Sequence, residues 1–471
     1  MKIKPCLYFL GLSCFPISIM ALMNIFYSFY FDYLAGIKSY AGVLFLSSLI
    51  GFALFKIGKK EQESISIYEQ IFLIFLIYFS ISFFIQIPIY FSDYNISFID
   101  SYFESISGLT GTGFTVFEHI KSLDPPLILW RSSSQWIGGL YFLIFLILIF
   151  SNKQVNFKLV DFSFNLEKKI NFSPNLRSVT TRILFIYSVL TVFIFSIFLI
   201  SGIRILDSLS LAMTVISSGG FLPTDSLNEI IRSNFQSITL CIGFLISILN
   251  FYLFYNIIFG RDNLKEHKED LYIIGTIIVF SMIFYFTNNL NFTSVLINIL
   301  SSVGNSGISI RAVPENFGLY FIILTLIGGS VLSTTSGIKL LRIYILIKAF
   351  LMEIYKLVQP NVVLNNKIMF SEKKINNENI KISFLVFILF FLSLFILSSI
   401  LLIDYLDFEN SFKLSILTLT NTVSSNIYDM DKVWFANLFT FSKISLIIFM
   451  VIAKVELVSI IILVQKVFFK N

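Results

Sequence analysis

A short segment, Phe103–Phe117, places the strongest constraint on how this chain can fold, because it lies between two long apolar runs. The runs, roughly Tyr68–Phe91 and Leu127–Phe150, are each long enough to cross a hydrocarbon core about 30 Å thick. A helix from about Phe98 to Leu109 would be only about 16 Å long, so it would end halfway across. The chain then meets a Thr-Gly-Thr-Gly sequence and has to turn back. Non-helical backbone is tolerated at that depth only where it is buried in protein or lines a watery cavity.

The residues of this turn are suited to binding a cation. Glycine permits positive φ, which can aim successive carbonyls in one direction, and threonine adds a side-chain oxygen. A short run of inward-pointing carbonyls can replace the water shell of a monovalent cation. The sequence therefore predicts an ion pore with a re-entrant loop.

The whole chain has the composition of a helical membrane protein. Of its 471 residues, 56% are hydrophobic and 13% are charged, and the mean hydropathy is +0.85. The apolar runs are unbroken, whereas the strands of a membrane barrel would alternate, so we expect an all-α polytopic protein with ten transmembrane helices. The predicted spans are roughly Cys6–Phe29, Tyr40–Ile57, Tyr68–Phe91, Leu127–Phe150, Val179–Gly202, Phe235–Phe259, Leu271–Phe286, Phe317–Lys348, Ile380–Ile403 and Trp434–Phe468.

Charge predicts the orientation of these spans. The loops rich in lysine and arginine are Lys56–Ser66, Asn152–Thr181, Gly260–Asp270 and Arg342–Lys381. On the opposite side, Ser92–Pro126 holds one lysine against five acids, and Asp404–Val433 holds two lysines against five acids. The positive-inside rule then places both termini in the cytoplasm and the acidic loops outside. The same rule accounts for the net charge of +6 without a nucleic-acid partner.

Three further loops repeat the pattern of a short apolar segment followed by small polar residues. We align the anchor residues of the four loops as Gly113, Gly219, Gly307 and Val423. The residues directly before the anchors carry hydroxyls: Thr112, Ser218, Ser306 and Thr422. The residues before those are small or polar: Gly111, Ser217, Asn305 and Asn421. Four such hairpins around one axis would form a single pore, with the partly negative ends of the short helices turned toward it.

The predicted organisation is therefore an extra helix pair followed by four span–pore-helix–span hairpins in a pseudo-fourfold arrangement. We place the pair at 1–66 and the hairpins at 67–152, 178–262, 270–358 and 379–471. A secondary transporter with broken helices is an alternative, but it would show two inverted halves. A membrane-embedded enzyme would need a nucleophile with a base or a metal at one depth. The two histidines, His119 and His267, lie in loops on opposite sides, so we expect no catalytic residues.

Several motifs resemble those of the TrkH-type subunits of the Trk/Ktr/HKT superfamily of potassium transporters. They are WRSSSQWIGG at Trp130–Gly139, NFYL at Asn250–Leu253, GGSVLSTTSGIKLLR at Gly328–Arg342 and KVEL at Lys454–Leu457. The resemblance implies uptake of K⁺, sometimes with Na⁺, through a selectivity filter in which K⁺ binds at the twelve aligned loop positions, with no covalent cofactor. It also implies a homodimer in the lipid of a bacterial cytoplasmic (inner) membrane. A cytosolic TrkA-like nucleotide-binding ring would lie beneath it, so a nucleotide would act only through this regulatory partner.

The resemblance further implies a gate below the filter. The implied gate residues are Gly328, Gly329, Ser330, Thr334, Thr335, Ser336, Gly337 and Lys454. Contiguous glycines and hydroxyl residues make a poor membrane helix, which favours a loop at Gly328–Gly337 over the alternative of a close helix-packing face. Lys454 would either face the pore and repel cations or extend to the inner membrane boundary. Its neighbour Glu456 would then pair with an adjacent basic residue.

The chain departs from the family pattern in the fourth loop and in the gate. Val423 stands where relatives usually have glycine, and the gate sequence is one glycine short of the family's. Because valine disfavours positive φ, we expect an irregular fourth wall and weaker K⁺ selectivity. A Na⁺-permeable or non-selective cation transporter of the same fold is therefore an alternative. The basic loop Arg342–Lys381 is a candidate docking surface for the cytosolic partner, although the positive-inside rule alone explains its charge.

Overall fold

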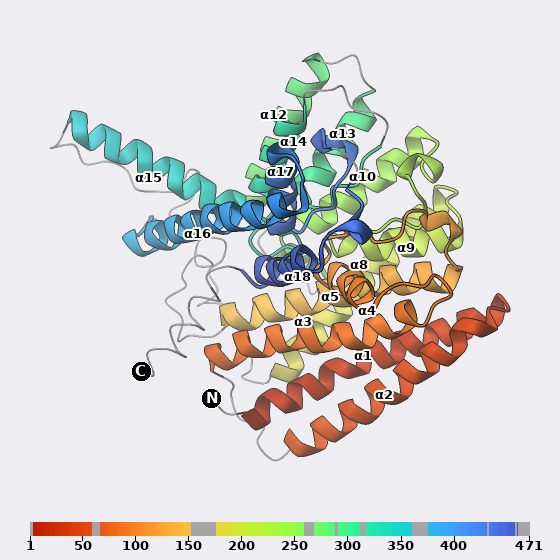
Figure 1. The fold of residues 1–471 in the computed structure, drawn as a ribbon. Helices are drawn as coiled ribbons and strands as arrows, with labels where there is room; N and C mark the ends of the chain where they lie inside the picture. Colours follow the sequence, from red (N-terminus) through yellow and green to blue (C-terminus); the bar gives the residue numbers. More distant parts are fainter. Residues whose placement is uncertain are drawn as a thin grey trace.

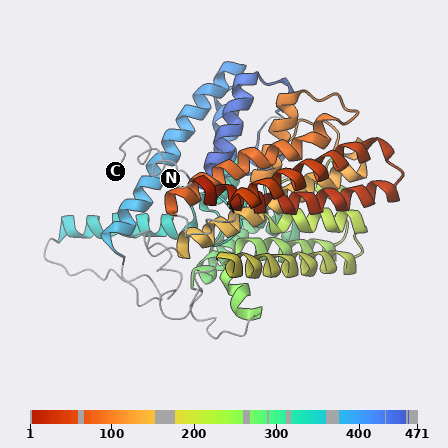
Figure 2. The same cartoon turned by 90° about the horizontal axis from the view of Figure 1, so that it is seen from below.

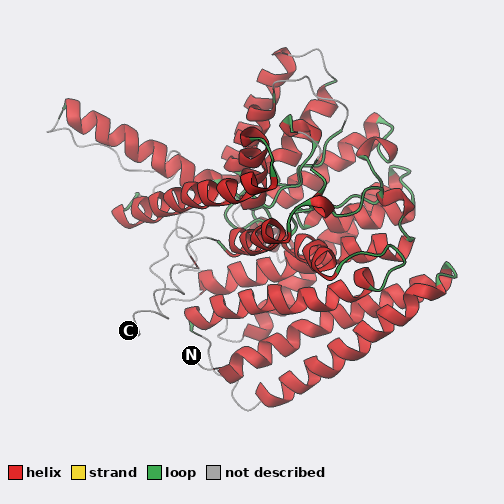
Figure 3. Ribbon diagram, viewed as in Figure 1, coloured by secondary structure: helices red, strands yellow, loops and turns green. Residues whose placement is uncertain are grey.

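The computed structural model describes residues 3–58, 66–151, 176–258, 268–287, 291–310, 317–359, 375–430, 433–456 and 459. Within these residues every regular element is a helix, as predicted (Figure 3). Most of the last predicted span beyond Glu456 lies outside the described residues, as do the unit boundaries at 152 and 262 and much of the basic loop Arg342–Lys381.

The N-terminal helices α1 (Ile3–Tyr30) and α2 (Leu34–Gly58) form an antiparallel pair along one side of the molecule (Figure 1 and Figure 2). They approach closely at small residues: a Cβ built on Gly11 would lie 2.6 Å from the backbone nitrogen of Phe55. The hydroxyls of Ser18 and Ser47 lie 2.7 Å apart across the same interface. Small and hydroxyl residues join helices in this way in membranes, where lipid tails remove the hydrophobic drive between helices.

Six helices among the described residues are long and apolar enough to cross a membrane. They are α1, α2, α3 (Ile67–Tyr90), α8 (Leu176–Ile200), α12 (Lys268–Thr287) and α16 (Asn377–Leu401). Large apolar side chains such as Phe26, Phe193 and Phe395 are exposed on them, which suits contact with lipid tails. The chain is therefore a multi-pass membrane protein.

In the described part of the chain, four short helices lie between the spans, and each is about half as long as a membrane-crossing helix. They are α4 (Phe98–Thr110), α9 (Ile205–Ile216), α13 (Phe292–Val303) and α17 (Phe408–Leu419). The helices that follow them are α5 (Pro125–Ser151), α10 (Asn234–Ile248) with α11 (Phe251–Ile258), α14 (Gly318–Ile327) with α15 (Leu340–Val358), and α18 (Thr440–Val455). Four successive hairpins result, which we number by chain order: α3–α5, α8–α11, α12–α15 and α16–α18.

The hairpins close into a ring. Helix α5 packs on α9, α10 on α13, α14 on α17, and α18 on α4, so each hairpin contacts the next and the fourth returns to the first. Hairpins 1 and 3 consequently face each other across the ring, and so do hairpins 2 and 4. Helix α15 projects from this body and packs along α16, which itself packs on α17 and α18 (Figure 1).

The predicted span Phe235–Phe259 is not one straight helix, because α10 and α11 are bent by 98°. Asn250 lies at the bend and caps α11: its Oδ1 accepts the backbone N–H of Tyr252 at 2.9 Å. Its own N–H donates to Asp270 Oδ1 at 3.0 Å. The asparagine of the NFYL motif therefore ends one helix and begins the next.

Candidate functional site

Each of the four short helices ends in the same left-handed turn. The residues with positive φ are Gly111 (80°), Ser218 (55°), Asn305 (56°) and Asn421 (48°). In every loop the N–H of this residue donates to the carbonyl three residues earlier, at 3.0–3.1 Å. Because the geometry repeats, it shows which residues are equivalent in the four loops.

This geometry corrects the predicted alignment of the second loop by one residue. Ser218 occupies the left-handed position, so it is equivalent to Gly111 and not to Thr112. The next residue, Gly219, is then equivalent to Thr112. The corrected set of anchor positions is Gly113, Gly220, Gly307 and Val423.

Two side-chain hydrogen bonds agree with the corrected alignment. The hydroxyl of Ser107 donates to the carbonyl of Phe114 at 2.7 Å, and that of Thr214 donates to the carbonyl of Phe221 at 3.0 Å. Ser217 caps the end of α9, and its hydroxyl bonds carbonyls of that helix. The sequence alone could not decide the alignment of loop 2, because either glycine of its Ser-Ser-Gly-Gly run could be the anchor.

Two asparagines connect neighbouring loops in the same manner. Asn421 Nδ2 donates to Thr112 Oγ1 at 3.0 Å, which joins loop 4 to loop 1. Asn305 Nδ2 lies 3.4 Å from Thr422 Oγ1, which joins loop 3 to loop 4. In both cases the asparagine occupies the left-handed position, which its short polar side chain tolerates well.

Two serines add bonds to the backbone of adjacent loops. Ser306 Oγ donates to the carbonyl of Gly219 at 2.5 Å, and Ser425 Oγ donates to the carbonyl of Gly307 at 2.6 Å. These contacts join loop 3 to loop 2 and loop 4 to loop 3. The sequence-predicted positions of all four loops are thus brought together at one place.

The meeting point has the polarity of a monovalent-cation site. The C-terminal ends of α4, α9, α13 and α17 all lead into it, and helix C-termini carry partial negative charge. Its polar atoms are backbone carbonyls, hydroxyls and amides. Among the residues the structure describes, no group of three His, Cys, Asp or Glu side chains is placed to hold a metal ion.

A buried ion pair, not predicted from the sequence, supports the first loop. Arg131 Nε and Glu104 Oε1 are 2.8 Å apart, and both side chains are at most 1% exposed. Glu104 Oε2 accepts the backbone N–H of Val116 at 2.9 Å, just after the loop. The guanidinium of Arg131 lies over the ring of Phe221 in loop 2, 4.1 Å from its centroid. The available signal was an arginine within an apolar span, which requires a buried partner.

The segment Gly328–Gly337 is not helical, since α14 ends at Ile327 and α15 begins at Leu340. Positive φ at Gly328 (62°) and Gly337 (82°) turns the chain at both ends of the segment. The backbone N–H of Ser330 donates to Ile248 O at 3.0 Å, so this segment packs against the bend between α10 and α11.

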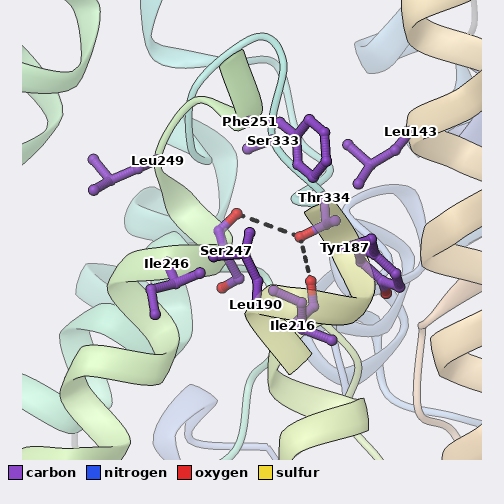
Figure 4. Close-up of a pocket in the computed structure, with 10 residues that line it drawn as sticks. All are labelled: Leu143, Tyr187, Leu190, Ile216, Ile246, Ser247, Leu249, Phe251, Ser333 and Thr334. Carbon is purple, nitrogen blue, oxygen red and sulfur yellow. Dashed lines mark hydrogen bonds between the residues drawn. The ribbon is translucent and has the colours of Figure 1, made fainter. Parts of the chain in front are cut away.

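This segment contacts two loops that face each other. Thr334 Oγ1 lies 2.9 Å from Ser218 Oγ in loop 2. The same hydroxyl donates to Ile216 O at 2.9 Å (Figure 4). Ser336 Oγ donates to Asn421 Oδ1 in loop 4 at 3.1 Å. Because hairpins 2 and 4 are opposed, a segment that touches both crosses the ring at the level where the short helices end.

Lys454 is buried inside the protein. It is 2% exposed, its ammonium donates to Thr334 O at 3.3 Å, and it lies 4.7 Å from the ring centroid of Phe142. A Cβ built on Gly111 would lie 3.7 Å from this ammonium. The positive charge therefore lies between the loops and the segment Gly328–Gly337.

Two further charged groups hold the same segment. The ammonium of Lys339 donates to Thr335 O at 2.6 Å, and Glu269 Oε1 accepts the N–H of Val331 at 2.9 Å. Glu456 pairs with Arg342 at 2.9 Å, as expected of a carboxylate beside a basic residue.

A small cavity beside Thr334, of about 10 Å³, has room for about one water (Figure 4).

Comparisons with known proteins agree on one kind of relative. No family model matches the chain. The chain is 26% identical over 431 residues to an uncharacterised cation transporter of Methanocaldococcus jannaschii, covering 90% of this chain and 87% of that one. It is 25% identical over 350 residues to the Trk system potassium uptake protein TrkH of Escherichia coli K12, covering 70% and 72%. The crystal structure of the potassium transporter TrkH from Vibrio parahaemolyticus matches the whole of both chains with a TM-score of 0.86 at 20% identity.

Proposed function

Because the chain is a TrkH-type member of the Trk/Ktr superfamily, a family of ion transporters and not of enzymes, we propose that it carries K⁺ into the cell through the four loops. The observation that carries the proposal is the convergence of four left-handed turns at the ends of four half-length helices. Carbonyls and hydroxyls gathered there supply oxygens for a dehydrated monovalent cation. The inside-negative membrane potential favours inward movement of the ion by a free energy of about 2.3 kcal/mol per charge per 100 mV.

The proposed filter has three residues in each loop, with the second loop in its corrected alignment. The proposed residues are Gly111, Thr112, Gly113, Ser218, Gly219, Gly220, Asn305, Ser306, Gly307, Asn421, Thr422 and Val423. The proposed gate is the segment Gly328–Gly337 together with Lys454. It is supported by the contacts of Thr334 and Ser336 with opposed loops and by the buried ammonium beside them.

The setting of the transporter is also a proposal. We infer a bacterial cytoplasmic membrane with both termini in the cytoplasm, a homodimer, and a cytosolic TrkA-like ring that binds the regulatory nucleotide. Apolar side chains such as Phe350, Leu351 and Ile354 are exposed on α15, which projects from the body, and they suit burial against a second copy or lipid. The basic residues near Lys356 suit an acidic face of a cytosolic partner.

The test is growth of a K⁺-uptake-deficient bacterium on limiting K⁺, with uptake of radioactive Rb⁺ as the direct readout. The chain should rescue growth, and Gly113→Ser should abolish most of the rescue. Gly113 has φ of 82°, and a Cβ there would lie 2.6 Å from Gly220 Cα, so a side chain both strains the turn and displaces loop 2.

Gly202→Ser is the matched control, since Gly202 has φ of 85° but a Cβ there meets nothing within 4 Å. It should retain uptake. If the wild-type chain, verified in the membrane and co-expressed with a ring subunit, moved neither Rb⁺ nor Na⁺, the proposed function would be wrong. Na⁺ uptake equal to Rb⁺ uptake would favour the non-selective alternative.

A further inference from the structure

Val423 breaks the symmetry of the filter through its side chain and not through its backbone. At the anchor position, φ is positive in two opposed loops, at Gly113 (82°) and Gly307 (69°). It is not positive at Gly220 or Val423, which occupy the other opposed pair. The expected strain from a valine at positive φ is therefore absent, because loops 2 and 4 do not use that conformation here.

The isopropyl group of Val423 reaches the opposite loop. A Cβ built on Gly220 would lie 2.6 Å from Val423 Cβ and 3.1 Å from Val423 Cγ1. A Cβ built on Gly307 would also lie 3.1 Å from Val423 Cγ1. Since loops 2 and 4 face each other across the ring, a side chain of loop 4 that contacts Gly220 lies in the space between them.

The loop on either side of Val423 is fixed by hydrogen bonds. Thr422 Oγ1 lies 2.9 Å from Thr420 Oγ1, and Ser425 Oγ donates to Gly307 O at 2.6 Å. Val423 is only partly buried, whereas Gly113, Gly220 and Gly307 are buried. Its partial exposure and its closeness to Gly220 favour a side chain that borders the space between the loops.

We propose that the Val423 side chain is an apolar constriction at the anchor level of the filter, and that it limits the rate of ion passage. The inference rests on the proposed function, because it assumes that ions cross the ring. Methyl groups offer no oxygen to a dehydrated cation, and apolar constrictions oppose the passage of hydrated ions. Because valine has a stiff χ1, it opens the path only when the side chain or loop 4 moves.

The experiment measures Rb⁺ flux into liposomes that contain the purified full-length protein. Val423→Ala and Val423→Gly should raise flux in that order, the glycine variant by about tenfold, which corresponds to a barrier lower by about 1.4 kcal/mol. Val423→Ile, which keeps the branched shape and adds one methylene, should lower flux. Val433→Ala is the control, because Val433 is a partly buried valine outside the filter, and it should leave flux unchanged.

A second readout does not depend on how well the smaller variants fold. The native cysteines Cys6, Cys14 and Cys241 are buried, so a small cationic thiol reagent added outside should block flux in Val423→Cys and leave the wild type unaffected. Equal flux in Val423→Ala, Val423→Ile and wild type, with no block of Val423→Cys, would overturn the inference while wild-type flux upheld the proposed function. Absence of wild-type Rb⁺ and Na⁺ flux would instead refute the proposed function.

Discussion

At the scale of single residues, the buried pair Arg131–Glu104 offers the clearest prediction. Arg131→Met should lower the free energy of unfolding by about 3–5 kcal/mol, because it leaves the Glu104 carboxylate buried without its cation. Loop 1 should also lose definition, since Glu104 holds the N–H of Val116. The measurements are thermal unfolding in detergent and the ratio of Rb⁺ to Na⁺ uptake.

The control for that prediction is another arginine with a carboxylate partner. Arg204 pairs with Asp207 at 2.8 Å, but its side chain is 79% exposed, so Arg204→Met should change stability by less than about 1 kcal/mol. A loss of stability in Arg131→Met no larger than in Arg204→Met would contradict the supporting role of the buried pair.

The conformational preferences of single residues predicted part of the filter but not all of it. The polar residues before the anchors suit the left-handed turn at Asn305 and Asn421, because asparagine tolerates positive φ. The same reasoning failed for loop 2, since Ser218 takes the left-handed position although two glycines follow it. The contact of Val423 with Gly220 could not be predicted from the sequence either, because it depends on which loops face each other across the ring.

At the scale of elements, the segment Gly328–Gly337 and helix α18 make a joint prediction. In the Val423→Gly background, Lys454→Ala should raise Rb⁺ flux further, by about tenfold, because it removes a buried positive charge 3.3 Å from Thr334 O on the proposed path. Lys454→Arg in the same background should give no such increase. Lys56→Ala is the control, since Lys56 is exposed in the last turn of α2, outside the ring. Unchanged flux when Lys454→Ala is added to Val423→Gly would remove Lys454 from the proposed gate.

The helix breaks show how far sequence patterns define elements. The break at Gly328–Gly337 was predictable, because adjacent glycines and hydroxyl residues oppose a membrane helix. The bend at Asn250 was not, since the surrounding run is apolar enough for a continuous span. It depends on Asp270, which is 20 residues away in sequence and holds the N–H of Asn250. A tertiary contact thus overrides the local pattern.

At the scale of the whole molecule, hydropathy and charge sufficed for the class of fold, and the repeated loop pattern sufficed for four hairpins. The sequence did not show how the hairpins meet. Ring closure rests on packing between elements far apart in the chain, such as α18 on α4, and on cross-loop bonds such as Asn421 to Thr112. These contacts join residues separated by hundreds of positions, where one sequence carries no pairing signal.

We predict that mutations in the N-terminal helix pair change the stability of the protein without changing the ion selectivity of the ring. Gly11→Ala should separate α1 from α2, because the new Cβ would meet the backbone of Phe55 and Gly51 at 2.6–2.7 Å. Gly42→Ala, with nothing within 4 Å, should be neutral or slightly stabilising, since alanine favours a helix over glycine by about 1 kcal/mol. If the ring alone forms the pathway, Gly11→Ala should lower the melting temperature in detergent and leave the ratio of Rb⁺ to Na⁺ uptake unchanged. A changed ratio would mean that the helix pair shapes the filter, through the contacts of α1 with α3 and α5.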